Sequence, residues 1–428
     1  MPGAAPSAGD PFAGRQLTAL SDAAFAALMA PLGPFGPSPE IMAGVSGGPH
    51  SLALALLLHR WARARGGTCL PVVVEHGLRA ESAAEAAGVA ALLAGQGMAP
   101  AVLPLGLPGG PGLQARARAG RYVALLGHAA ALGVPYLALG HHAGDQAETL
   151  LLRAGDGSGP AGLAGMAAWR AAGAAVILRP LLGVPPARLE AVVAAAGLVP
   201  VRDPSNADPR FTRIRLRSAL AEAPAAEAAL GRAAGLFATQ RAAVEAAQAA
   251  RLGRCLTLHP EGFARIDLAA LGRDAVAVAA FGQALRLVGG GEYAPGAAAL
   301  RHLLHQGAGT LQGVQLGADG VLAREVASLA PPQAARPGLL WDRRWLVEAT
   351  PPELEIGALG PAGEGPARPA WMPGRVHQGL PALRAQGKLV AVPALGYAPL
   401  GPVPGLRLRL APGGAALGAG VAVRALSG

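Results

Sequence analysis

The sequence contains very little cysteine and no closely spaced cysteine pair. Its two cysteines, Cys69 and Cys255, lie far apart among 428 residues. A disulfide framework, a structural zinc ribbon and an iron–sulfur cluster all require several cysteines at short spacings. The sequence therefore argues against these three kinds of site.

Lysine is almost absent as well. Lys388 is the only lysine, so arginine supplies nearly all of the positive charge behind a formal net charge of +10 and a pI near 10.9. This balance favours a polyanionic partner, with nucleic acid as the first candidate. The planar guanidinium of arginine suits phosphate groups and base edges. Compositional drift in an Ala-, Gly- and Pro-rich chain explains the arginine excess equally well.

From the sequence we expect neither a signal peptide nor an uninterrupted membrane span. Its first residues have neither a basic region nor an apolar core. Residues 122–140 have about the length of a membrane span. However, they contain His128 and the break Gly133-Val134-Pro135, so we interpret them as a helix, a turn and a buried strand. We expect a soluble, cytoplasmic protein with no membrane partner.

The length allows two or three domains with substantial cores. We expect a Pro/Gly-rich lead-in over residues 1–39 and an α/β domain over 40–220. A small helical domain over 221–310 and a small mixed or β-rich domain over 311–428 would follow.

Short β-rich runs alternate with helix-length segments in the α/β domain. The predicted strands are 41–45, 70–75, 101–105, 136–140 and 175–179, and the predicted helices are 51–65, 81–96, 114–132, 145–154 and 186–196. Continuously apolar strands that alternate with helices indicate a Rossmann-like parallel sheet covered on both faces. Ligands of such sheets bind beyond the carboxyl ends of the strands.

The segment Ser46-Gly47-Gly48-Pro49-His50-Ser51 follows the first predicted strand and opens a helix. Adjacent glycines let the backbone approach a ligand closely. The start of the helix adds unpaired N–H groups and the positive end of its dipole. Together these features indicate a phosphate site, whereas the segment taken alone is equally consistent with an ordinary tight turn.

Polar residues also follow the fourth predicted strand, from His141 to Thr149. Asp145 and Glu148 are three residues apart, so they share one face of the helix that begins there. They are suited to binding Mg²⁺ or to general-base catalysis, and simple capping of the helix is the alternative. A zinc site is disfavoured because His141 and His142 are adjacent and point in different directions.

A third group contains the arginines that follow a strong turn signal at Asp203-Pro204-Ser205-Asn206. Arg210, Arg213 and Arg217 fall on one helical face. This face is suited to contacting a phosphate backbone, or it is a solvated basic face with no ligand.

These segments resemble the PP-loop ATPases and, among them, the tRNA(Ile)-lysidine synthetases. The family pattern Ser-Gly-Gly-x-Asp-Ser is similar to residues 46–51, Val-Asp-His-Gly-Leu-Arg to 74–79, His-His-x-x-Asp-Gln-x-Glu-Thr to 141–149, and a Gly-rich segment to 157–163. Residues 202–206 and the later arginines also match. The resemblance covers about residues 40–220 well and the remainder loosely.

The resemblance implies ligation of free L-lysine to the wobble cytidine of a CAU-anticodon tRNA(Ile). ATP would adenylate the cytosine C2 oxygen with release of pyrophosphate, and the lysine amine would displace AMP. The implied catalytic residues are His76, Arg79, His141, Asp145 and Glu148, with Asp145 also as an Mg²⁺ ligand. The implied ATP-binding residues are Ser46, Gly47, Gly48, Pro49, His50 and Ser51, and the implied tRNA-binding residues are Arg202, Asn206, Arg210, Arg213 and Arg217. The resemblance is compatible with a homodimer.

Two positions depart from the family pattern. His50 replaces the acidic residue of the PP-loop, and Gly144 stands where many relatives carry another aspartate. Imidazole is a poor Mg²⁺ ligand, so we expect His50 to slow adenylation unless a protonated imidazole contacts phosphate instead.

Two other functions stay open. The chain is either an active lysidine synthetase or a relative that binds tRNA or nucleotide without turnover. A different PP-loop enzyme, such as a tRNA thiolase, is the third reading, although the lack of paired cysteines counts against cysteine-based sulfur transfer.

Overall fold

The computed structural model describes residues 18–75, 77, 81–106, 113–172, 175–201, 212–291, 293–361 and 365–411. Within these limits the chain forms two compact units. The first contains the described parts of Met1–Pro111, Ala138–Asp156 and Arg179–Ala234, and the second contains those of Gly112–Leu137, Gly157–Leu178 and Gly235–Gly428.

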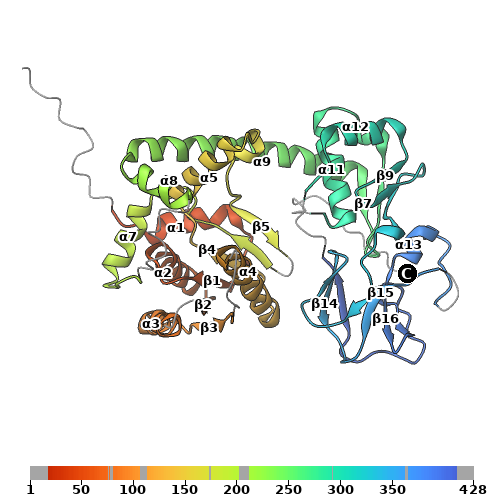
Figure 1. Ribbon diagram of the computed structural model, residues 1–428, viewed down its shortest axis with the longest axis horizontal. Helices are drawn as coiled ribbons and strands as arrows, with labels where there is room; N and C mark the ends of the chain where they lie inside the picture. Colours follow the sequence, from red (N-terminus) through yellow and green to blue (C-terminus); the bar gives the residue numbers. More distant parts are fainter. Residues whose placement is uncertain are drawn as a thin grey trace, which may run out of the picture. The chain divides into compact units, whose positions relative to one another are not determined.

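The N-terminal half of the chain has an α/β fold built around one sheet, which contains parallel and antiparallel strand pairs (Figure 1). Its strands are β1 (Glu40–Val45), β2 (Thr68–Glu75), β3 (Ala101–Pro104), β4 (Tyr136–Leu139), β5 (Trp169–Ala172) and β6 (Ala175–Leu178). Their order is β3-β2-β1-β4-β6-β5. Strands β1, β2 and β3 pair in parallel, as predicted, whereas β5 pairs antiparallel with β6.

The strand order places a topological switch point between β1 and β4. The chain moves from β1 outward through β2 to β3, and then crosses to β4 on the other side of β1. The loops that leave β1 and β4 therefore diverge at neighbouring strand ends. Ligands of open α/β sheets bind in this position.

Helices surround this sheet. They are α1 (Asp22–Met29), α2 (Pro49–Arg63), α3 (Ser82–Gly95), α4 (Leu113–Leu132), α5 (Ala143–Gly155), α6 (Pro160–Leu163), α7 (Pro186–Ala195) and α8 (Thr212–Ala221). Most predicted helices and strands of this region occur with boundaries shifted by one or two residues. The sequence analysis did not predict strand β5 or the short helix α6.

Helix α2 is central to the first unit. Residues Leu52 to Leu58 are all buried, which is possible because α2 packs between β1, β2 and α7. Helix α1 packs on α2 as well, and an ion pair of 2.8 Å joins Arg60 to Asp22. The apolar run after Ser51 is therefore the core helix of this unit, and its N-terminus is held in a fixed position.

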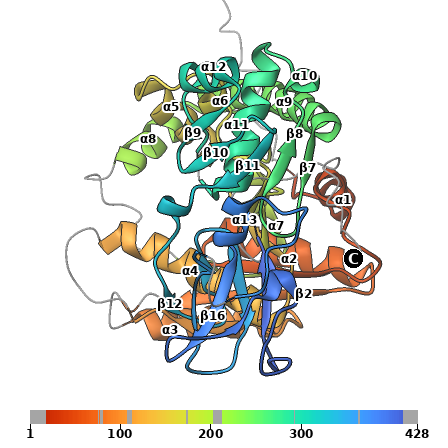
Figure 2. The same cartoon turned by 90° about the vertical axis from the view of Figure 1, so that its right-hand side faces the viewer.

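The second unit begins its C-terminal part with α9 (Pro224–Cys255), which runs on from the first unit. A sheet follows in the order β7-β8-β11-β10-β9, formed by Leu256–Leu258, Ala264–Ile266, Val321–Arg324, Val314–Leu316 and Gly309–Leu311. Helices α10 (Leu268–Leu271), α11 (Ala275–Gly289) and α12 (Ala297–Gln306) lie beside this sheet (Figure 2). Residues 221–310 are thus mostly helical, but they include β7 and β8, which are too short to be recognised in the sequence.

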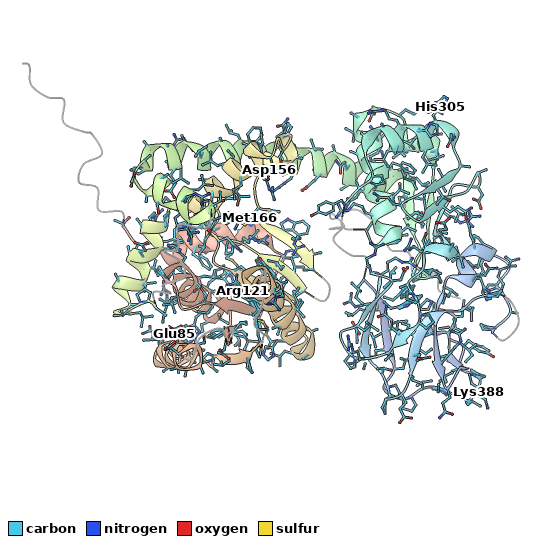
Figure 3. All side chains as sticks on the ribbon, viewed as in Figure 1. Glu85, Arg121, Asp156, Met166, His305 and Lys388 are labelled. Carbon is cyan, nitrogen blue, oxygen red and sulfur yellow. The ribbon has the colours of Figure 1, made fainter. Side chains whose placement is uncertain are left out.

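The last part of the chain is rich in β-structure, as expected. One sheet has the order β12-β15-β16-β17, from Gln333–Ala334, Glu355–Ala358, Pro381–Ala385 and Lys388–Ala391. Another has the order β13-β14-β18, from Leu340–Trp341, Trp345–Ala349 and Arg407–Leu410, and α13 (Gly374–Gln378) is the remaining helix. The single lysine, Lys388, is exposed at the start of β17 (Figure 3).

Two buried arginines share one carboxylate in this part of the chain. Asp342 accepts hydrogen bonds from Arg324 and from Arg344, and Arg344 also donates to the carbonyl oxygen of Gly262. These contacts tie β11 to the β13–β14 hairpin. They show that some of the arginine excess is structural rather than reserved for a polyanion.

Among the helices that the structure describes, we find none with the length and apolar character needed to traverse a lipid bilayer.

Candidate functional site

The turn between β1 and α2 has a backbone that requires glycine at position 47. Gly47 has a φ of +81°, and a Cβ at this position would lie 2.6 Å from Cγ2 of Val89. The Gly47 carbonyl oxygen accepts a hydrogen bond from the Val201 N–H. Gly47 is therefore enclosed on the protein side, and it fixes the path of the turn.

Gly48 has the opposite environment. Its φ is −69°, and the nearest atom to a Cβ at this position would be Oγ of Ser46 at 3.8 Å. Gly48 caps α2 without a side-chain hydrogen bond, and Pro49 occupies the first turn. The first N–H groups of a helix have no partner within it. This open backbone at the positive end of α2 is the arrangement that binds phosphate.

Ser46 and Ser51 stabilise the turn through hydrogen bonds within it. The Ser51 hydroxyl donates to the carbonyl oxygen of Gly48 at 3.0 Å and accepts from the Ser46 N–H at 3.1 Å. The two hydroxyl oxygens are 3.2 Å apart. Both serines predicted to bind ATP therefore shape the loop, and their hydroxyl groups lie beside its open face.

Gly140 lets the loop after β4 approach the start of α2. A Cβ at position 140 would lie 3.0 Å from the carbonyl oxygen of His50 and 3.1 Å from Cα of Ser51. Because Gly140 has no side chain, the His141–Thr149 segment can lie against the turn between β1 and α2. The structure thus joins two of the predicted polar groups at the switch point between β1 and β4.

His50 lies at this junction. Its ring packs edge-on against the ring of His142, with 4.0 Å between the centroids. Its Nε2 atom lies 3.6 Å from Oε1 of Glu190 on α7. Burial, with a further contribution from His142, lowers the pKa of His50 to about 4. The imidazole is therefore neutral at pH 7, which argues against the expectation that a protonated His50 contacts phosphate.

His142 and Asp145 form a capping box at the start of α5. The His142 Nδ1 accepts from the Gly144 N–H at 3.1 Å, and the Asp145 Oδ2 accepts from the His142 N–H at 3.0 Å. The structure thus confirms the capping role that was the alternative for Asp145. Although burial opposes it, the pKa of Asp145 lies below its ordinary value because His142, His141 and Arg217 favour the carboxylate.

Arg217 on α8 pairs with both carboxylates of α5. It donates to Glu148 at 2.7 and 3.2 Å through two nitrogens, and a longer contact of 3.4 Å reaches Asp145. Glu148 is 4% exposed, and burial raises its pKa even though Arg217 favours its charged form. Arg217 was predicted to contact tRNA, but here its guanidinium is engaged in the protein.

The described residues do not provide a protein-only Mg²⁺ site. They contain no group of three or more His, Cys, Asp or Glu side chains placed to hold a metal ion. Asp145 and Glu148 already accept hydrogen bonds from Arg217. Mg²⁺ in proteins commonly binds through one or two carboxylates together with phosphate oxygens of a substrate.

Of the other predicted site residues, the structure describes two, His141 and Arg213. His141 is half-buried beside Asp145, and Arg213 is exposed on α8. The remaining predicted residues, His76, Arg79, Arg202, Asn206 and Arg210, lie outside the described residues.

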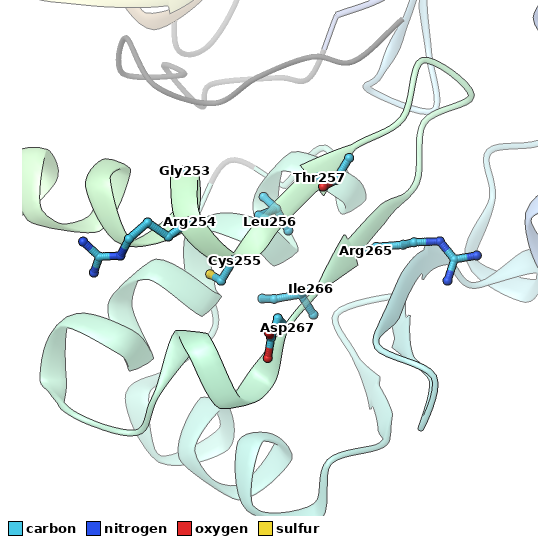
Figure 4. Close-up of a pocket in the computed structure, with 8 residues that line it drawn as sticks. All are labelled: Gly253, Arg254, Cys255, Leu256, Thr257, Arg265, Ile266 and Asp267. Carbon is cyan, nitrogen blue, oxygen red and sulfur yellow. The ribbon is translucent and has the colours of Figure 1, made fainter. Parts of the chain in front are cut away.

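A hollow in the second unit carries no comparable chemistry. It is lined by Gly253, Arg254, Cys255, Leu256, Thr257, Arg265, Ile266 and Asp267. Arg254 and Arg265 extend away from it on opposite sides (Figure 4). We therefore place the functional site at the β1 and β4 loops.

Two carboxylates of this region were missed in the sequence. Glu190 lies in α7 beside His50, and Glu227 lies in α9 close to Gly144. Neither residue stands in a motif, and each is brought to the site by a helix that is remote in sequence. No sequence signal pointed to them.

Comparisons with known proteins identify the family of the chain. Residues 20–223 match the family model of the PP-loop domain. A tRNA(Ile)-lysidine synthase of Novosphingobium aromaticivorans is 49% identical over 44% of this chain and 58% of its own length. One of Rhodopseudomonas palustris is 48% identical over 42% of this chain and 53% of its own length. This chain thus matches little more than half the length of these two relatives.

A third relative matches along most of both chains. The tRNA(Ile)-lysidine synthase of Ruegeria pomeroyi is 36% identical over 85% of this chain and 90% of its own length. Such a match extends beyond the PP-loop domain and includes the helical and β-rich parts. The chain therefore belongs to the tRNA(Ile)-lysidine synthase family.

Proposed function

We propose that this protein is a tRNA(Ile)-lysidine synthase that uses ATP to join lysine to C2 of the wobble cytidine of a CAU-anticodon tRNA. The observation that best supports this proposal is that the loops after β1 and β4 lie against each other at the topological switch point. One loop has an anion-binding backbone, and the other has carboxylates paired with Arg217. Relatives with this name match the chain in and beyond the PP-loop domain.

The turn at Gly47 and Gly48 would hold the phosphates of ATP. Its free N–H groups and the dipole of α2 stabilise negative charge. The same groups would favour the first step, in which the cytosine C2 oxygen attacks the α-phosphorus and pyrophosphate leaves. Because His50 is neutral at pH 7, it adds no positive charge to this step. The backbone and the helix dipole would supply the stabilisation.

The first turn of α5 would receive the lysine. The amine attacks C2, the bond to the AMP oxygen breaks, and the amine loses a proton. A protonated amine has an ordinary pKa of about 10.4, so a carboxylate must accept this proton or pass it on. Burial raises the pKa of Glu148, which makes it a better base than an exposed glutamate. Arg217 would hold Glu148 and Asp145 in place for this role.

The part of the chain after residue 220 would hold the tRNA. We propose that the PP-loop catalytic domain spans residues 40–220, and that residues 221–310 and 311–428 contact the tRNA as separate domains. The net charge of +10 suits this partner. Free lysine, ATP with Mg²⁺, and tRNA would meet in the cytoplasm.

A second candidate function is tRNA or nucleotide binding without turnover. The observation that favours it is His50, an uncharged imidazole in the turn where the family carries an acidic residue. The two functions predict different products. A binding protein would retain tRNA and ATP but would release no pyrophosphate.

The test is pyrophosphate release with ATP, Mg²⁺ and tRNA, followed by lysine addition and analysis of the nucleoside. We expect tRNA-dependent pyrophosphate first, and AMP with lysidine once lysine is present. A tRNA with a CAU anticodon but a methionine identity is the matched substrate control. Tight binding of both substrates without pyrophosphate would establish the second candidate instead.

A further inference from the structure

Trp371 is a large aromatic side chain that is 45% exposed in the second unit. Hydrogen bonds hold the turn that carries it. The Met372 N–H donates to the carbonyl oxygen of Pro369 at 3.0 Å, and the Arg368 guanidinium donates to the carbonyl oxygen of Met372. The Met372 side chain is fully buried. The indole is therefore presented at the surface by a turn whose backbone is anchored to the core.

The indole also belongs to a stack of nearly parallel rings. Its centroid lies 6.4 Å from that of Phe263, with 24° between the ring planes. The Phe263 ring lies 4.1 Å from that of His259, with 11° between the planes. Phe263 and His259 are buried, so Trp371 is the exposed member of the stack. An aromatic face that is already restrained loses little conformational entropy when it binds a flat partner.

The chain on both sides of this turn has a charge of one sign. Glu364 is the last acidic residue of the sequence. Residues 365–428 contain seven cationic side chains, which are Arg368, Arg375, Arg384, Lys388, Arg407, Arg409 and Arg424. In the described part of the chain, two of these cations pair with carboxylates of other segments. The excess of positive charge over this length favours a polyanionic partner.

Arg368 places one of these cations in the same turn as the exposed indole. The group that accepts its hydrogen bond is a backbone carbonyl oxygen, which does not neutralise the guanidinium. An aromatic face beside a cation complements a nucleotide, because the base stacks and the phosphate pairs with the charge. Bases of a duplex are stacked on one another, whereas an unpaired base can be splayed out onto an aromatic side chain.

We propose that Trp371 is a stacking platform for an unpaired nucleotide of the tRNA, and that Arg368 contacts a phosphate of the same strand. This inference rests on the proposed function and deepens it, because it assigns the contact to two residues of the β-rich part of the chain. Both residues act on the affinity for tRNA and take no part in the reaction.

The first test compares the tRNA affinities of Trp371→Ala and Trp371→Phe by fluorescence anisotropy of labelled tRNA. Loss of one stacked base should weaken binding about tenfold in Trp371→Ala. Phenylalanine keeps an aromatic face, so Trp371→Phe should retain most of the affinity. Tyr293→Ala, a change at an aromatic side chain that is 75% exposed, is the matched control and should bind tRNA as the parent does. Thermal unfolding of each variant separates a loss of fold from a loss of binding.

The dependence of the affinity on salt separates the two contacts. A phosphate contact releases counterions, so its loss changes the slope of log affinity against log salt concentration. Arg368→Gln should reduce this slope by about 1, and Trp371→Ala should leave it unchanged. Arg336→Gln removes an exposed charge elsewhere in the second unit and should also leave it unchanged. An equal reduction in Arg336→Gln and Arg368→Gln would overturn the contact assigned to Arg368.

Tryptophan fluorescence gives a readout that does not depend on the alanine variant. A base that stacks on an indole quenches its emission, so part of the quenching by tRNA should be missing in Trp371→Phe. Equal quenching in the parent and this variant would overturn the platform. A folded Trp371→Ala that binds tRNA as tightly as the parent would do the same. If that variant instead loses a dimer of the parent, the indole belongs to a contact between two copies.

The platform and the proposed reaction can fail separately. If the parent forms no lysidine, but Trp371→Ala still weakens tRNA binding about tenfold, the reaction fails and the platform stands. If lysidine forms with the same KM for tRNA in the parent and in Trp371→Ala, the platform fails and the reaction stands.

Discussion

The Oε1 atom of Glu190 lies 3.6 Å from the Nε2 atom of His50. Glu190 belongs to α7, and His50 stands in the turn that opens α2. A carboxylate thus lies next to the position where the family pattern has an acidic residue. An aspartate introduced at position 50 would meet a like charge.

This contact predicts the outcome of restoring the family residue. We expect His50→Asp to raise the rate of pyrophosphate release above that of the parent, and His50→Asp with Glu190→Gln to raise it further. Because Glu190 is 60% exposed, the additional gain should be modest, about threefold. The measurement is tRNA-dependent pyrophosphate release at saturating ATP. A double variant slower than His50→Asp alone would show that Glu190 assists the site and does not oppose an aspartate.

The lowered pKa of His50 predicts a dependence of stability on pH. Its folded-state pKa of about 4 lies below the ordinary value of 6.5. The unfolded chain therefore binds more protons between these two values, and stability falls as the pH decreases through this window. His50→Gln should remove at most about 3 kcal/mol of this fall.

Denaturant unfolding of the parent and His50→Gln at pH 7 and pH 4.5 checks this prediction. His142 also has a lowered pKa, so part of the slope should remain in the variant. Identical slopes in the two proteins would show that His50 titrates in the same way in the folded and unfolded chains.

The pairing of Arg217 with Glu148 predicts a stability change as well. Arg217→Ala leaves a carboxylate that is 4% exposed without its partner, and this should cost about 1–3 kcal/mol of unfolding free energy. Arg213→Ala, a change at an exposed arginine of the same helix, is the matched control and should cost little. The added change Glu148→Gln should recover part of the loss. A neutral Arg217→Ala would mean that solvent replaces the ion pair.

The two glycines of the turn should respond differently to alanine. Gly47→Ala places a Cβ 2.6 Å from Val89 at a φ of +81°, so we expect a lower melting temperature and weak ATP binding. Gly48→Ala meets no protein atom closer than 3.8 Å, so its melting temperature should stay close to that of the parent while ATP binding falls. Equal ATP affinity in Gly48→Ala and the parent would argue against phosphate at this face.

Much of the first unit could be predicted from the sequence because its signals are local. Apolar strand runs, Gly-Gly and the carboxylates at the start of a helix each act within a few residues, and they indicated β1, β2, α2 and α5 with small errors. The loops after β1 and β4 were expected to share a sheet edge, and the structure joins them through Gly140.

The remaining features depend on contacts between distant segments. Strands β7 and β8 have only three residues each, which is too short for a period-2 pattern to emerge. Glu190, Glu227 and the pairing of Arg217 with Glu148 reach the site from α7, α9 and α8. Spacing along the chain carries no information about such contacts. Arg217 illustrates this limit, because its helical face suggested a phosphate contact while its guanidinium binds two carboxylates.

The most direct measurement is lysidine formation by the purified protein with ATP, Mg²⁺, lysine and the CAU-anticodon tRNA(Ile). We predict AMP, pyrophosphate and lysidine in equal amounts, with pyrophosphate appearing before lysine is added. Bound tRNA that yields neither pyrophosphate nor lysidine, in the parent and in His50→Asp alike, would contradict the proposed reaction.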